Sequence, residues 1–117
     1  MSDIHLDHSV LSALRDVMED EFPVLLDTFL ADSTERLRQI QDSQRLADSQ
    51  ALRLAAHSFK GSCSNMGALL LAGLCKQLED IAHRDQLADA PALILQIEEE
   101  FLIVRALMQE ERRGLAG

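Results

Sequence analysis

Residues 91–108 read PALILQIEEEFLIVRALM, and the apolar positions of this stretch decide the fold. Its main apolar residues are spaced three, four, three and four positions apart: Ile94, Ile97, Phe101, Val104 and Met108. This spacing is typical of a helix that packs almost antiparallel against its neighbours along a narrow seam. We therefore predict a bundle helix that begins at Pro91 and ends near Arg113, before Gly114.

Four further stretches have the apolar periodicity of amphipathic helices, at about 8–18, 23–44, 48–66 and 70–84. Val17 belongs to the apolar stripe of the first stretch and Leu70 to that of the fourth, so both are expected to face the core. Asp7 is a suitable N-cap for the first of them, and Gly67 a suitable C-terminal cap for the third. The connections between the last four helices are short, so consecutive helices should be antiparallel. The predicted fold is all-α: an antiparallel up-and-down four-helix bundle with a short additional N-terminal helix across one end.

The composition limits the possible functions. The chain has 117 residues, which predicts a single domain over 1–117, and 20 acidic against 11 basic residues give a net charge of −9. Such an acidic chain is not expected to bind nucleic acid or anionic lipid, because both are negatively charged. It contains no signal-like N-terminus and no apolar run approaching the roughly 20 residues that span a bilayer. We expect a cytoplasmic monomer.

The two cysteines, Cys63 and Cys75, make no metal-binding motif. They fit a reducing compartment, although their number alone leaves a disulfide open. We interpret both as small core residues rather than as a redox pair.

Residues 48–66 carry the functional information. At about 100° per residue, a helical projection places Leu52, Ala55 and Phe59 on the core side. His57 then lies on the opposite side, in the middle of the helix, where solvent or a partner can reach it. An exposed imidazole is largely uncharged and nucleophilic at pH 7. Most exposed histidines have no function, so this position alone is weak evidence.

The neighbours of His57 on the same face strengthen the interpretation. They lie at offsets of −4, +3, +4 and +7 from it: Arg53, Lys60, Gly61 and Ser64. A glycine inside a helix costs about 1 kcal/mol relative to alanine. Gly61 would let the backbone of another protein approach the ring, although a tight helix crossing would also explain it. Lys60 could neutralise a phosphoryl group, and Leu54 could form the apolar part of a docking surface.

These residues carry a resemblance. The segments 56–62 (AHSFKGS), 65–68 (NMGA), 74–75 (LC) and 78–79 (LE) resemble the motif of the histidine-containing phosphotransfer (HPt) family. The motif covers about residues 52–79, and the predicted order of the helices extends the resemblance over the whole chain. The size and the lack of appended domains resemble stand-alone bacterial members, of the HptB type. Glu79 stands at a matched family position; it either supports the helix pair or is an ordinary surface glutamate.

The resemblance implies a phosphorelay intermediate. His57 would accept a phosphoryl group at Nε2, its more exposed nitrogen, from a phospho-aspartate of a receiver domain, and donate it to another receiver. The receivers would belong to hybrid sensor kinases and response regulators. Lys60 would stabilise the phosphoryl charge, and the docking residues would be Gly61, Ser64, Arg53 and Leu54.

The same resemblance implies what the chain does not need. Mg²⁺ is expected on the receiver only, and this chain should need no cofactor or metal of its own. It contains no P-loop and no Gly-rich nucleotide loop, so we expect a phosphocarrier rather than an enzyme. The alternative is a helical adaptor that binds a receiver-like partner without being phosphorylated.

Overall fold

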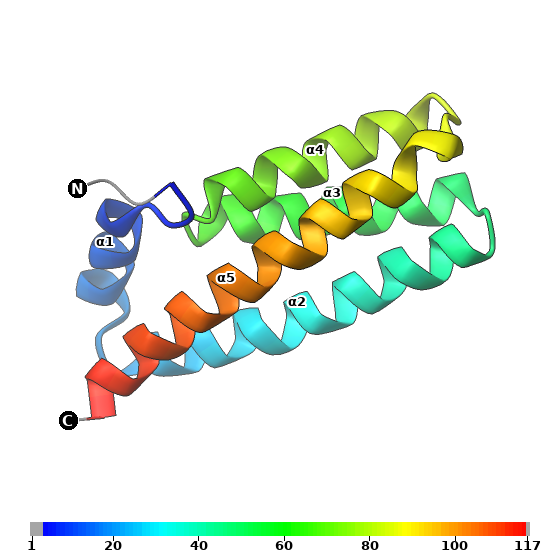
Figure 1. The fold of residues 1–117 in the computed structure, drawn as a ribbon. Helices are drawn as coiled ribbons and strands as arrows, with labels where there is room; N and C mark the ends of the chain where they lie inside the picture. The colour runs from blue at the N-terminus through cyan, green and yellow to red at the C-terminus, as the bar shows by residue number, and fades with distance from the viewer. Residues whose placement is uncertain (1–3, 117) are drawn as a thin grey trace.

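The computed structural model describes residues 4–116, and within this range the chain is helical with no strand (Figure 1). In chain order, its elements are α1 (His8–Met18), the 3-10 turn η1 (Glu19–Glu21), α2 (Phe22–Arg45), α3 (Ser49–Asn65), α4 (Leu69–His83), the 3-10 turn η2 (Leu87–Asp89) and α5 (Ala90–Ala116). Helices α2 to α5 run alternately up and down, and α1 lies across the end where α3 turns into α4 (Figure 1). The predicted four-helix bundle with a short N-terminal helix is confirmed.

Local caps explain where the helices begin and turn. The carboxylate of Asp7 accepts from the backbone N–H of Ser9 at the start of α1, as predicted, and Asp48 does the same for Ala51 at the start of α3. Gly67 follows α3 with φ +79°, and a Cβ there would lie 3.0 Å from the Asp7 carbonyl oxygen. The Asp7 N–H donates to the Gly67 carbonyl at 2.9 Å, so this turn also holds the N-terminal segment against the bundle.

The core follows the predicted seams. The five apolar positions of the α5 seam are all buried, and so are Leu52, Ala55 and Phe59 of α3. The rings of Phe59 and Phe101 meet edge to face at 6.1 Å inside the core, between helices α3 and α5 on opposite sides of the bundle.

Cys63 of α3 and Cys75 of α4 are buried free thiols. A hydrogen bond with Cys75, together with burial, raises the pKa of the Cys63 thiol. A thiol with a raised pKa is a poor nucleophile, so these side chains act as small core residues.

Three sequence expectations were wrong in detail. Val17 continues the apolar pattern of α1 but is 80% exposed, because this short helix contacts the bundle mainly through Leu11. Leu70 is also exposed, since only one of three consecutive leucines at the start of α4 can face the core, and that residue is Leu71. Helix α5 continues through Gly114 to Ala116, which lets Leu115 pack against the core.

None of the helices formed by the described residues has both the length and the apolar character needed to cross a membrane.

Candidate functional site

His57 lies at the centre of the exposed face of α3. Its side chain is 62% exposed, while Phe59, two residues later, is fully buried on the other side of the helix. The exposure predicted from the helical projection is confirmed.

A glutamate from the neighbouring helix orients this histidine. Glu79 of α4 places Oε2 2.8 Å from Nδ1 of His57 and Oε1 2.9 Å from Nζ of Lys60. One carboxylate therefore holds two side chains of α3, and its own side chain is only 14% exposed.

The charge of Glu79 determines which ring nitrogen of His57 donates a hydrogen bond. Burial alone would raise the pKa of the Glu79 carboxyl, but hydrogen bonds from Lys60 and His57 outweigh it and hold this pKa below its usual value. Glu79 is therefore ionised at neutral pH and only accepts hydrogen bonds. Nδ1 of His57 must carry the proton that is shared with Glu79, which leaves the lone pair of the neutral ring on Nε2. The arrangement presents one nucleophilic nitrogen to solvent.

Glu79 was not among the site residues predicted from the sequence. Its position in the family motif was the available signal, but an ordinary surface glutamate fitted that signal equally well. The pairing depends on how α3 and α4 are aligned, because Glu79 lies 22 and 19 residues after its two partners.

The structure places the other predicted residues around the ring. Lys60 reaches Glu79 on the α4 side, so its ammonium contacts the carboxylate that binds the ring. Arg53, one helical turn before His57, forms no ion pair with any residue in the described range 4–116. Leu54 is 53% exposed, and Ser64 is also exposed.

Gly61 lies in the interior of α3, on the same face as His57. A Cβ added there would meet nothing within 4 Å, so no neighbouring helix requires a glycine at this position. The tight helix crossing considered for Gly61 is therefore excluded. Because Gly61 has no side chain, the backbone of α3 is uncovered one turn from the imidazole.

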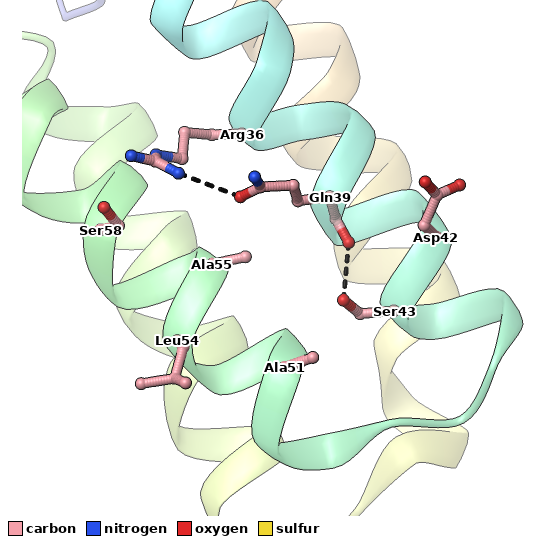
Figure 2. Close-up of a pocket in the computed structure, with 8 residues that line it drawn as sticks. All are labelled: Arg36, Gln39, Asp42, Ser43, Ala51, Leu54, Ala55 and Ser58. Carbon is pink, nitrogen blue, oxygen red and sulfur yellow. Dashed lines mark hydrogen bonds between the residues drawn. The ribbon is translucent and has the colours of Figure 1, made fainter.

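A groove between α2 and α3 opens beside this face (Figure 2). Its volume is about 470 Å³. Helix α2 contributes polar side chains and α3 contributes mainly small or apolar ones; the lining residues are Arg36, Gln39, Asp42, Ser43, Ala51, Leu54, Ala55 and Ser58. The sequence indicated the apolar α3 side of this groove through Leu54.

Among residues 4–116, no group of three or more His, Cys, Asp or Glu side chains is placed to hold a metal ion.

Known proteins share the sequence pattern and the fold of this chain. The model of the Hpt domain family matches residues 24–110. The crystal structure of histidine-containing phosphotransfer protein B (HptB) from Pseudomonas aeruginosa PAO1 is similar with a TM-score of 0.92 and 60% sequence identity, over 93% of this chain and 95% of that one.

The HPT domain of an Hpt sensor hybrid histidine kinase from Shewanella matches with a TM-score of 0.81 and 19% identity, over 98% of this chain and 100% of that one, and so shares the fold. No curated protein matches the chain. Because the family model spans most of the sequence and the similarity to HptB extends over nearly the whole chain, this protein belongs to the Hpt domain family of histidine phosphotransfer proteins.

Proposed function

We propose that this protein is a phosphorelay intermediate that carries a phosphoryl group on Nε2 of His57. It accepts the group from a phospho-aspartate on the receiver domain of a hybrid sensor kinase and passes it to the receiver of a response regulator. The observation that carries the proposal is the hydrogen bond between Glu79 and Nδ1, which leaves Nε2 of a 62% exposed ring as the free nucleophile.

In the forward step, the Nε2 lone pair attacks phosphorus while the bond from phosphorus to the aspartate oxygen breaks. The aspartate leaves as a carboxylate, and the ring, now bonded to phosphorus and still protonated at Nδ1, gains a positive charge. The Glu79 carboxylate, 2.8 Å from Nδ1, stabilises this charge. In the reverse step a carboxylate oxygen attacks phosphorus and a neutral imidazole leaves. Transfer in either direction thus needs no proton to enter or leave the ring.

Positioning and charge stabilisation do most of the work in phosphoryl transfer. This chain would supply the nucleophile, and Lys60 would add positive charge on the α4 side of the ring. Mg²⁺ is expected at the receiver's aspartate only. The protein would therefore act as a carrier and not as an enzyme with its own cofactor.

The docking face would surround His57 on α3. Leu54 offers an exposed apolar contact, and Gly61 leaves space for the partner's backbone. Arg53 and Ser64 extend the face by one turn before the histidine and two turns after it. We expect a monomer to dock this face against one receiver at a time, in the cytoplasm, where buried free thiols such as Cys63 and Cys75 stay reduced.

The test is phosphotransfer from a panel of phosphorylated receiver domains to the wild-type protein, to His57→Gln and to His83→Gln. His83 is also exposed, in the last turn of α4, and provides a matched control. We expect an acid-labile adduct on the wild type and on His83→Gln, and no adduct on His57→Gln. An adduct on His57→Gln would show that another residue is phosphorylated. Binding of receivers without any adduct would favour the adaptor.

A further inference from the structure

We propose that Arg36 selects among receivers by binding a carboxylate side chain that the receiver inserts into the groove between α2 and α3. This inference rests on the proposed function, because it concerns the partner that docks beside His57. It adds a residue of α2 to a docking face that the sequence placed on α3.

The position of Arg36 connects the groove with the reacting histidine. Its side chain reaches from α2 across the groove toward Ser58 of α3 (Figure 2). Ser58 follows His57 directly in the sequence, so the Arg36 end of the groove is the end next to the imidazole. A segment that occupies this end therefore belongs to a partner that also reaches His57.

The guanidinium of Arg36 is only partly satisfied within the described part of the chain. Its Nη1 donates to Oε1 of Gln39 at 3.1 Å. Its Nη2 forms an ion pair along the helix with the Asp32 carboxylate at 3.7 Å, a distance too long for a hydrogen bond. Its Nε is buried and has no hydrogen-bond partner among residues 4–116. The planar fork of an arginine suits a carboxylate, which can bind two of its N–H groups at once.

Arg38 shows the contrast on the same helix. Its guanidinium binds Glu35 through two nitrogens and Asp42 through a third, so its charge is already compensated. Residues two positions apart lie on nearly opposite sides of a helix, which directs Arg38 away from the groove. Arg38 therefore carries the same charge as Arg36 without the same opportunity to bind a partner.

The rest of the groove determines how the partner enters. Ala51, Leu54 and Ala55 give it an apolar wall that can cover the aliphatic part of an inserted side chain. Asp42 lines the far end, where its carboxylate already pairs with Arg38 and Arg45. Arg36 is the one basic residue among those that line the groove, so a negative group should bind at its end. The Arg36 side chain is 31% exposed, so a carboxylate entering there can reach its Nη groups.

The test measures the Kd of each receiver of the panel for the wild type, Arg36→Ala, Arg36→Lys and Arg38→Ala, by titration that does not depend on phosphotransfer. We expect Arg36→Ala to raise the Kd of the preferred receivers by about tenfold and Arg36→Lys to restore part of the affinity. The Kd of Arg38→Ala should stay within about twofold of the wild-type value. The salt dependence of Kd should be smaller for Arg36→Ala than for the wild type. Circular dichroism checks the fold, and Arg36→Lys provides the comparison if Arg36→Ala does not fold.

Equal affinities of wild type, Arg36→Ala and Arg36→Lys for every receiver that binds would overturn the inference, as would the absence of any receiver that binds. If Arg36→Ala lost affinity to the same extent at every salt concentration, the group bound by Arg36 would be a neutral hydrogen-bond acceptor. That result would also contradict the proposed carboxylate. Failure of the proposed function has a different signature, namely receivers that bind tightly and leave no phosphoryl group on His57.

Discussion

The carboxylate of Glu79 joins His57 to Lys60, with Oε2 2.8 Å from Nδ1 of the imidazole and Oε1 2.9 Å from Nζ of the lysine. All three side chains are polar and come from two adjacent helices, but only the histidine is largely exposed. A residue on α4, and not α3 alone, therefore determines which nitrogen of the ring keeps its lone pair.

Replacing Glu79 by glutamine should slow phosphotransfer to His57. The change removes the charge that holds the Nδ1 proton and stabilises the phosphorylated ring. A hydrogen bond to a charged group is worth about 1.5–3 kcal/mol, which corresponds to a rate loss of about 10- to 100-fold. Rapid-quench kinetics measures the rate, and nitrogen NMR of the imidazole should show a mixture of tautomers in the variant.

Asp80→Asn is the control for this experiment. Asp80 adjoins Glu79 on α4 and pairs with the exposed Lys76, so its loss should leave the rate and the tautomer of His57 unchanged. A Glu79→Gln protein with the wild-type tautomer and the wild-type rate would show that Glu79 only joins the two helices.

The role of Lys60 can be separated from that of Glu79 by a double-mutant cycle. If Lys60 acts only through the carboxylate, Lys60→Ala should slow transfer in the wild type and have little further effect in Glu79→Gln. If its ammonium acts on the phosphoryl group directly, the two losses should add and the phosphohistidine should hydrolyse faster. We expect additive losses. Lys76→Ala, which removes a lysine paired with Asp80, should have no effect on either measurement.

Glu79 should also make the stability of the fold depend on pH. Its pKa is lowered in the folded protein, whereas the unfolded chain should have the ordinary value of about 4.3. The carboxylate therefore contributes stability above about pH 4.3, and this contribution is lost as the pH falls through the folded value. Urea unfolding at several pH values should show a difference between wild type and Glu79→Gln that shrinks on acidification. A difference that is constant between neutral and acidic pH would contradict this.

The sequence predicted features that depend on one helix at a time. Whether Phe59 is buried or His57 exposed follows from the periodicity of a single helix. Val17 and Leu70 were placed wrongly because their exposure depends on how much of α1 and α4 the other helices cover. The pairing of Glu79 with His57 depends on the alignment of two helices, which no pattern within one of them records.

The groove at Arg36 was missed for the same reason. Its walls come from two helices, and the polar positions among residues 36–43 look like ordinary solvated side chains in the sequence. Only the packing of α2 against α3 places the arginine beside the apolar residues of α3.

Gly61 provides a test that separates stability from function. The position is helical and open, so Gly61→Ala should stabilise the fold by about 0.5–1 kcal/mol. The larger Gly61→Gln should keep the melting temperature near that of the wild type and lower transfer from receivers by about tenfold or more, because its side chain occupies the surface where a partner's backbone approaches. Thermal unfolding and transfer kinetics on the same samples measure both effects.

Gly73 of α4 is the matched control, since it is also exposed, helical and free of neighbours within 4 Å of an added Cβ. Gly73→Ala should stabilise the protein to a similar extent, and Gly73→Gln should transfer at the wild-type rate. A fall in melting temperature for Gly61→Gln would make this glycine a packing residue. Normal transfer by a stable Gly61→Gln would remove it from the docking face. Slow transfer by both glutamine variants would mean that the docking face extends over α4 as far as Gly73.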